Sequence, residues 1–298
     1  MRQYLDLVRD IMMRGKVKHP PQGVDAISLA GACMHFDLDE GFPLITTRSL
    51  QGSWRAICGE LLWFLSGSTD IRDLRAKFGV HLWDAWATPE ICARFGRKPG
   101  DLGPLYGQQW TNFGATPSRF SENGSTLEYA KDGRNQIAIA VDLLKRTPDS
   151  RRIRVSSWNI KDVWKDSEGR EENVFITPCH GTFQLLHAEG ELSMILNQYS
   201  GDVPVGIPFN TAEYALLLMM IAQVVGMKAK ELIHFIGDAH IYVNQISDME
   251  EQLKREPRQL PRVSINPDAK DIFSFRLDDF TLDGYDPHPA IKGIPVAL

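Results

Sequence analysis

Apolar residues recur at helical spacing along four stretches of the chain, and each stretch predicts a helix. The first ends at Gly15 and carries the stripe Tyr4, Leu5, Leu7, Val8, Ile11 and Met12. The second, Trp54 to Leu65, is strongly apolar, ends at Gly67 and contains one acid, Glu60. The third is Asn135 to Lys145. The fourth, Thr211 to Val225, is so uniformly apolar that it predicts a buried central helix.

Alternating or short apolar runs between these helices predict strands. Three of these runs each predict one separate strand: Ile27 to Leu38, Arg151 to Trp158 and Leu232 to Ile236. Phe183 to Leu186 and Leu192 to Leu196 flank the turn sequence Ala188-Glu-Gly-Glu191, and together they predict a hairpin. Short strands and proline-rich loops are expected over the final forty residues.

The remaining segments predict loops inside one domain. Residues 83–107 are rich in Gly, Pro and aromatic residues and predict long ordered loops, whereas Lys161 to Asn173 is polar and predicts a surface excursion. No sequence period repeats, and no linker shows a break in composition. We therefore expect a single α/β domain over residues 1–298.

Composition narrows the class of protein. The 298 residues are 43% apolar and 24% charged, as in ordinary globular proteins. The net charge of -5 gives no overall attraction to nucleic acid or to an anionic membrane, so we expect neither as a partner. The first helix does not resemble a signal peptide, and no apolar run approaches the roughly 20 residues of a membrane helix.

The four cysteines are Cys33, Cys58, Cys92 and Cys179. They lie far apart, without a CxxC pair or a zinc-ligand spacing, so we expect no metal and a reduced, cytoplasmic protein. Only Cys179 has neighbouring residues that suit a nucleophile, in the segment Thr177-Pro-Cys-His-Gly181. A neighbouring histidine or cation can stabilise a thiolate, although a buried inert cysteine is the commoner outcome.

Three further clusters could bind a ligand. The segment Asn197 to Asn210 is dense in amide, hydroxyl and acid groups, which could bind the edge of a base or simply cap the next helix. Arg151 and Arg152 could bind phosphate or form a solvated edge. His240 and Tyr242, two residues apart, could hold a sugar hydroxyl, or His240 could be a core histidine.

Taken in order, these segments resemble the folate-dependent thymidylate synthase family, which uses a cysteine nucleophile. The similarity runs nearly end to end. Its blocks are GFPLITTR (41–48), ELLWFLSGSTDI (60–71), LWDAW (82–86), GDLGPLYGQQW (100–110), PDSRRI (148–153), PCH (178–180), QYSGD (198–202), GIPFN (206–210), GDAHIY (237–242), GYDPHPAIK (284–292) and PVAL (295–298).

The resemblance implies a role for each matching residue at the nucleotide. Cys179 would attack C6 of the pyrimidine, and C5 would then accept a one-carbon unit from 5,10-methylenetetrahydrofolate. Asn210 would bond N3 and O4 of uracil, whereas cytosine-specific relatives carry Asp there. His240 and Tyr242 would hold the sugar. Gln198, Tyr199 and Ser200 lie in the same substrate-binding block.

It also implies roles for the proton network and the folate. Glu60 would move protons to O4 and from C5, together with Tyr106, His180 and Gln198, because burial raises a carboxyl pKa towards the working pH. The residues expected at the folate are Arg48, Trp83, Trp86, Asp202, Gly206 and Leu298. Arg48 stands where a lysine is usual, and the tail ending at Leu298 would close the site. Exclusion of water favours methyl transfer over hydroxymethyl transfer.

The sequence departs from the family pattern at the substrate phosphate. Four arginines are usual there, and Arg151 and Arg152 match the pair that the neighbouring subunit donates. Pro21 and Tyr199 stand where the other two are expected. Their loss would weaken phosphate binding by roughly two to four powers of ten unless Arg154, Lys18 or His19 compensates.

Three hypotheses for the function therefore remain. The first is conversion of dUMP to dTMP with release of dihydrofolate. The second is C5 hydroxymethyl transfer, or action on another pyrimidine nucleotide such as dCMP, CMP or UMP, or one with an altered phosphate. The third is a catalytically silent nucleotide-binding relative, against which the intact Cys179, Glu60 and tail count. The resemblance implies a bent mixed sheet covered by helices on one face, and a homodimer formed through the opposite faces.

Overall fold

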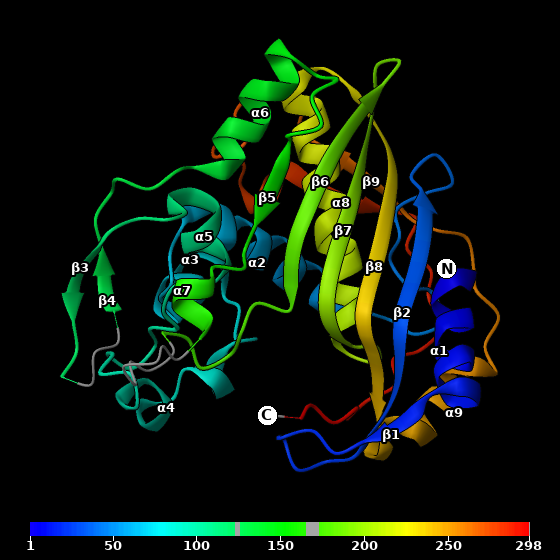
Figure 1. Cartoon of the computed structure of the whole chain (residues 1–298). Helices are drawn as coiled ribbons and strands as arrows, with labels where there is room; N and C mark the ends of the chain where they lie inside the picture. The colour runs from blue at the N-terminus through cyan, green and yellow to red at the C-terminus, as the bar shows by residue number, and fades with distance from the viewer. Residues whose placement is uncertain (123–125, 165–172, 298) are drawn as a thin grey trace.

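The computed structural model describes residues 1–122, 126–164 and 173–297. Its centre is a six-stranded sheet in the order β1-β2-β8-β7-β6-β5 (Figure 1). The strands are β1 (Lys16–Lys18), β2 (Ala26–Asp37), β5 (Arg154–Ser156), β6 (His180–Ala188), β7 (Glu191–Asp202) and β8 (Lys228–Tyr242). Neighbours are antiparallel except β7 and β8, which are parallel, so the sheet is mixed as expected.

The predicted hairpin joins β6 to β7 at Glu189 and Gly190. Both residues have positive φ, 49° and 82°. Two consecutive positive φ values are typical of the type I′ turn, whose twist suits a two-residue hairpin. The hairpin prediction is confirmed. The turn sets the register as far as Thr182 opposite Asn197, and an irregularity between His180 and Thr182 then shifts it so that His180 pairs with Gln198.

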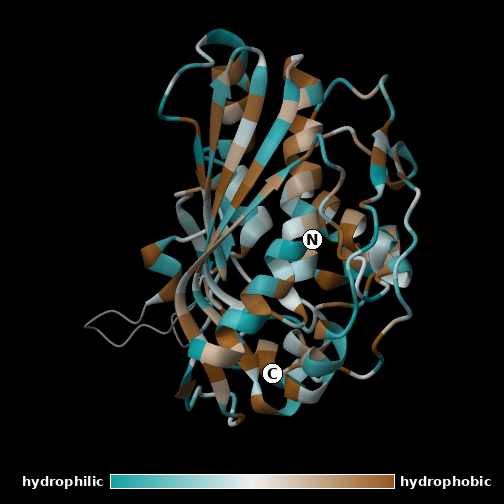
Figure 2. Ribbon diagram, turned by 90° about the vertical axis from the view of Figure 1, so that its right-hand side faces the viewer, coloured by the Kyte–Doolittle hydropathy of each residue, from teal (hydrophilic) through white to brown (hydrophobic). Residues whose placement is uncertain are grey.

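Helices cover one face of the sheet, as the side view shows (Figure 2). The longer helices are α1 (Arg2–Arg14), α2 (Trp54–Ser66), α3 (Ile71–Phe78), α6 (Gln136–Arg146), α8 (Gly206–Val225) and α9 (Ile246–Leu253). Short helices are α4 (Pro89–Ala93), α5 (Tyr106–Asn112) and α7 (Ile160–Val163). The remaining strands form two small pairs, β3 (Pro117–Phe120) with β4 (Thr126–Tyr129), and β9 (Arg262–Ile265) with β10 (Phe280–Asp283).

The central helix α8 contacts both parallel strands, β7 and β8. By length and composition its 20 residues could cross a membrane. The expectation that no apolar run approaches that length is therefore wrong. However, most of the helix is buried inside the protein, as in the core helix of a globular domain. The prediction of a buried central helix is confirmed, and the helix begins five residues earlier than Thr211.

Several other predicted boundaries need correction. The strand predicted over Arg151 to Trp158 is only β5, so both arginines lie in the preceding turn. The polar segment Asn197 to Asn210 is not a loop, because β7 continues to Asp202 and α8 begins at Gly206. The short strand predicted at Leu232 is the fifteen-residue β8, and the loops predicted over residues 83–107 contain α4 and the start of α5.

The predicted surface excursion, Lys161 to Asn173, falls partly outside the described residues. Its described ends are not simply solvated, because Asp162 and Asn173 are buried. The carboxylate of Asp162 accepts hydrogen bonds from Tyr129 and from Gln109. The side-chain amide of Asn173 also donates to Asp162, over 2.9 Å. These contacts fasten α7 to the small β3–β4 pair and to α5.

Replacement of Gly67 by alanine tests how α2 ends. Gly67 has φ +75°, and a Cβ there would lie 2.4 Å from Oγ1 of Thr111. Gly79 has a similar φ of +68° but open space around it. We expect both alanine variants to lose about 1–2 kcal/mol from the left-handed backbone, and Gly67→Ala to lose about 1–3 kcal/mol more from overpacking. Urea unfolding would measure both, and equal losses would contradict the role of Thr111.

Candidate active site

Cys179 lies directly before β6, where the chain enters the sheet. Its N–H donates to the hydroxyl of Tyr106 over 2.9 Å, and its carbonyl accepts from the N–H of Tyr199 over 2.7 Å. Among the described residues, the carbonyl of Thr177, at 3.7 Å, is the single hydrogen-bond partner of Sγ. Burial raises the pKa of the thiol to about 11. The backbone of Cys179 is therefore fixed while its sulfur has no strong partner.

Stacked rings hold the neighbouring residue, His180. The rings of Tyr106 and His180 are nearly parallel, at 6°, with centroids 3.9 Å apart. Burial lowers the pKa of His180 to about 3, so its imidazole is neutral near pH 7. Nε2 lies 3.5 Å from Nδ2 of Asn210, and Nδ1 lies 2.9 Å from the hydroxyl of Tyr214. Because an amide NH₂ can only donate, Nε2 accepts and Nδ1 carries the proton.

A chain of hydrogen bonds running in one direction orients Asn210. Thr211 donates to Nδ1 of His234 over 3.1 Å, and Nε2 of His234 donates to Oε1 of Gln198 over 2.9 Å. Burial lowers the pKa of His234 to about 3, so this neutral ring can accept and donate. Gln198 donates to Oδ1 of Asn210 over 3.0 Å, and Nδ2 of Asn210 donates to Oε2 of Glu213 over 3.4 Å. The amide of Asn210 thus has one preferred orientation.

Two buried carboxyl groups lie at the end of this chain. Glu60 on α2 is 7% exposed and Glu213 on α8 is 2% exposed. The indole N–H of Trp83 donates to Oε1 of Glu60. Burial raises the pKa of Glu60, and burial followed by the charge of Glu60 raises that of Glu213 well above its ordinary value. Ionisation of either carboxyl therefore opposes ionisation of the other.

The C-terminal segment is fastened near Asp202, at the end of β7. The side-chain amide of Gln245 donates to both oxygens of Asp202, at 3.3 and 3.2 Å, and also to the carbonyl of Pro295 at 2.7 Å. Burial raises the pKa of Asp202. One glutamine therefore connects this carboxyl to the tail that the sequence analysis expects to close the site.

The other predicted folate residues lie in different surroundings. The guanidinium of Arg48 is buried and donates to the carbonyl of Pro204, beside the turn that precedes Gly206. Trp83 and Trp86 are half-buried, with ring centroids 5.7 Å apart. Leu298 lies outside the described residues. The roles of all these residues towards a folate stay predictions.

The parallel register of β7 and β8 sets the predicted sugar residues beside Asp202. Asp202 is paired with His240, and Ser200 with Asp238. The rings of His240 and Tyr242 lie 5.1 Å apart, edge to face. Asp238 accepts from Nζ of Lys18 over 2.7 Å. Its pKa is lowered, first by His240 and then by its other hydrogen-bond donors, so it is a carboxylate.

Neither Pro21 nor Tyr199 brings a cation to the expected phosphate position. The ring of Tyr199 lies 5.3 Å from that of Trp158, and a Cβ on Gly181 would come within 2.0 Å of it. Pro21 is exposed in a turn. Lys18 is paired with Asp238 and His19 with Asp25, so each of these side chains already has an acidic partner. Arg151, Arg152 and Arg154 are exposed and form no ion pair with the described residues of their own subunit.

Comparison with protein-family models decides between the possible families. The model described as thymidylate synthase matches residues 2–297. The chain belongs to the thymidylate synthase family. The resemblance found in the ordered motifs is confirmed, and the chain is a one-carbon transferase. Thymidylate synthases transfer a one-carbon unit from a reduced folate to C5 of a pyrimidine nucleotide.

Sequence reasoning missed three residues that contact members of the candidate site. They are Glu213, Tyr214 and His234, which contact Asn210, His180 and Gln198 respectively. Glu213 could have been predicted, because it is a single acid inside an apolar helix, as Glu60 is. Tyr214 and His234 resemble ordinary core residues in sequence, and only the pairing of strands and helix reveals their partners.

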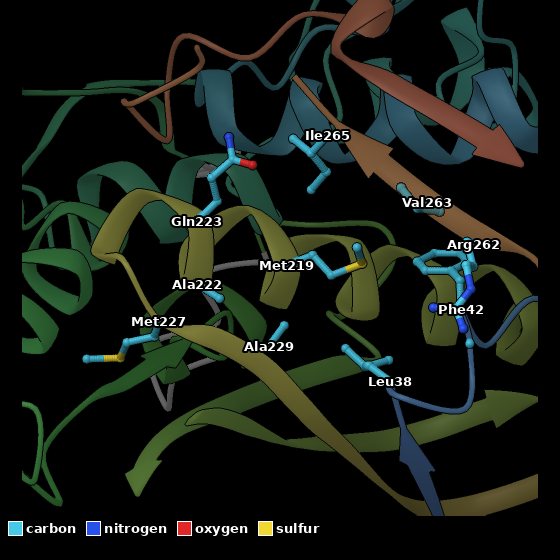
Figure 3. A pocket seen from close by; sticks show the side chains of 11 residues that line it. Leu38, Phe42, Met219, Ala222, Gln223, Met227, Ala229, Arg262, Val263 and Ile265 are labelled. Atoms are coloured by element: carbon cyan, nitrogen blue, oxygen red, sulfur yellow. The ribbon is translucent and has the colours of Figure 1, made fainter. Parts of the chain in front are cut away.

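A separate cavity lies between α8, β8, β9 and the loop after β2 (Figure 3). Its volume is about 300 Å³, and its lining is mainly apolar. It includes Phe42, Met219, Met227 and Val263, with Gln223 and Arg262 as polar members. None of the predicted site residues lines it, so it is distinct from the thymidylate synthase site. In the described part of the chain, no cluster of three His, Cys, Asp or Glu could hold a metal ion.

Alkylation of Cys179 without ligand tests its electrostatic environment. With a pKa of about 11 instead of 9.0, the thiol should hold about a hundredfold less thiolate at pH 7 than an ordinary cysteine. We expect iodoacetamide to modify Cys179 correspondingly slowly, and about tenfold faster per pH unit up to pH 11. Peptide mapping by mass spectrometry separates Cys179 from the exposed Cys33. Modification at the rate of free cysteine at pH 7 would contradict this environment.

Proposed function

We propose that this thymidylate synthase family member methylates C5 of a uracil nucleotide, converting dUMP to dTMP with release of dihydrofolate. The observation that carries the proposal is the directed chain ending at Asn210. Its amide oxygen faces Gln198 and its NH₂ faces Glu213. An oxygen that accepts from N3–H and an NH₂ that donates to O4, in place of its 3.5 Å contact with His180, match uracil. Cytosine presents the opposite pattern at both atoms.

Cys179 is the proposed nucleophile. Its thiolate adds to C6 of the ring, and the electron pair displaced to C5 makes that carbon able to accept the one-carbon unit. Tyr106 holds the backbone of Cys179 and stacks on His180, so the thiol and the histidine move as one unit. Glu60 exchanges protons with O4 and C5, for which a raised pKa is suited.

The folate is expected beside Trp83, Trp86 and Asp202. Two half-buried indoles suit a flat heteroaromatic ring, and the buried carboxyl of Asp202 suits its N–H groups. When bound, the folate supplies the one-carbon unit and the hydride. Because Trp83 also donates to Glu60, the indole that would contact the folate is connected to the proposed proton-transfer group. The tail near Pro295 would exclude water, which favours methyl over hydroxymethyl transfer.

A second candidate is favoured by the phosphate end of the site. With Pro21 and Tyr199 in place of arginines, and with Lys18 and His19 already paired, binding of an ordinary 5′-phosphate depends on arginines from elsewhere. The alternative is C5 hydroxymethyl transfer, or transfer to another pyrimidine nucleotide such as dCMP, CMP or UMP, or to one with an altered phosphate.

Exchange of the C5 proton tests the proposal without the folate. We expect the enzyme to release tritium from [5-³H]dUMP, because addition of Cys179 to C6 makes C5 exchangeable, and Cys179→Ala to release none. With methylenetetrahydrofolate, the expected products are dTMP and dihydrofolate, identified by mass and absorbance. UMP, dCMP and CMP serve as competing substrates. A hydroxymethyl product with tetrahydrofolate would favour the second candidate. No exchange with any of the four nucleotides would exclude both candidates except for a substrate with an altered phosphate.

We also propose that two copies pack through the uncovered sheet face. Leu186, Tyr199 and Phe235 lie on the neighbouring strands β6, β7 and β8 and are 37%, 42% and 43% exposed. An exposed apolar patch on a sheet without covering helices is typical of an interface. In such a dimer, the exposed Arg151 and Arg152 would complete the neighbouring site and supply the missing positive charge.

Placing a charge on this face tests the dimer. Phe235→Asp should shift the protein from dimer to monomer in sedimentation velocity, because burial of an unpaired carboxylate opposes association. C5 exchange should be lost with the dimer. Phe273→Asp is the matched control, since Phe273 is equally exposed at 43% but lies outside the sheet. A wild-type enzyme that is active as a monomer would overturn the proposal.

A further inference from the structure

Glu213 stands out because nothing in the proposed reaction requires it. It is the one charged residue in the twenty-residue helix α8, and its side chain is almost fully buried. An ionised carboxylate in such surroundings is costly unless it is paired. No basic side chain among the described residues offers that pairing, and none of their N–H or O–H donors reaches Oε1 of Glu213.

The carboxyl group that interacts with Glu213 is that of Glu60. Glu60 and Glu213 approach each other from α2 and α8 and interact through their side chains. The other titratable groups that interact with this pair are the Cys58 thiol on α2 and the Tyr214 hydroxyl on α8, and burial raises the pKa of both. Both are therefore neutral near pH 7. The charge of one carboxyl is felt chiefly by the other.

We propose that Glu213 and Glu60 form a carboxyl pair that holds a single proton, and that Glu213 is a positioning residue for proton transfer and for Asn210. The inference rests on the proposed function for its kinetic consequence, because it assigns Glu60 the exchange with substrate. The single proton first moves within the pair, so that the O–H bond of Glu213 breaks as an O–H bond forms on Glu60. Glu60 then passes that same proton to C5, and the proton that C5 loses in exchange returns to Glu60 and restores the pair.

Glu213 also orients the side-chain amide of Asn210, which is the group proposed to contact the base. Its Oε2 accepts from Nδ2 of Asn210, the last donor in the chain that begins at Thr211. Without an acceptor there, the Asn210 amide loses the contact that turns its NH₂ towards Glu213. Glu213 therefore has two functions, orientation of Asn210 and proton transfer to Glu60. The variant Glu213→Gln separates them, because glutamine can still accept from Asn210 but cannot pass a proton to Glu60.

Infrared titration of the ligand-free protein tests the shared proton directly. The carbonyl band of a protonated buried carboxyl should disappear at a higher pH in the wild type than in Glu213→Gln or Glu60→Gln. The sign follows because a neighbouring like charge raises the pKa of the last proton, and each variant removes that charge. We expect a shift of at least one pH unit. The double variant assigns the band, and Glu250→Gln, at an exposed position, should leave it unchanged.

Equal midpoints in the wild type and either single variant would overturn the proposal, because the two carboxyls would then titrate independently. Absence of any band that the double variant removes would overturn it as well. Neither result depends on catalysis. The titration therefore remains decisive even if the enzyme shows no C5 exchange, which would remove the proposed function instead.

Kinetics of C5 exchange separate the two purposes of Glu213. In Glu213→Gln we expect KM for the nucleotide to stay within about threefold while kcat falls at least tenfold, since general acid–base groups contribute about 10²–10⁴-fold. In Glu213→Ala both should worsen, because Asn210 loses its acceptor. The alkaline limit of kcat should also move to lower pH in Glu213→Gln. An unchanged kcat and pH profile in Glu213→Gln would show that Glu213 is only structural.

Discussion

Parallel pairing of β7 with β8 is the constraint on which the site depends. Parallel strands require a crossover, and here the crossover is α8 itself. The ends of both strands therefore meet the first turns of α8, and Gln198, Asp202 and His240 come together with Asn210. In open sheets this edge is where ligands bind. The apolar length of α8 and the polar character of its first turns are two aspects of one arrangement.

A second constraint is that polar groups in this apolar core must satisfy one another. A satisfied hydrogen bond contributes about 0.5–1.5 kcal/mol, whereas an unpaired buried group costs about 1–3 kcal/mol. The chain from Thr211 through His234 and Gln198 to Asn210 meets this demand with neutral groups only. The orientation of Asn210 is thus fixed before any nucleotide binds. Preference for uracil would follow from that orientation and not from a flexible contact.

The sequence predicted four of the longer helices and the hairpin, because apolar periodicity and turn residues report local structure, but it missed α3 and α9. It placed Cys179, Glu60 and Asn210 through motifs, since those residues lie in matching blocks. It did not predict that Asn197 to Asn210 is a strand end joined to a helix start, because polar side chains hid the strand pattern. Nor did it find His234 or Glu213, whose partners lie on other elements. Spatial pairing of this kind is set by sheet register, which no local pattern reports.

Tyr199 belongs both to the phosphate-binding end of the site and to the uncovered sheet face. Tyr199 packs on Trp158 and over Gly181 on the uncovered face, where an arginine would instead carry charge. With Tyr199 at this position, the chain has exposed apolar surface there in place of a cation. If two copies meet there, positive charge returns through Arg151 and Arg152 of the neighbour. Substrate choice and dimer formation are then governed by the same substitution, so a change at Tyr199 should alter both together.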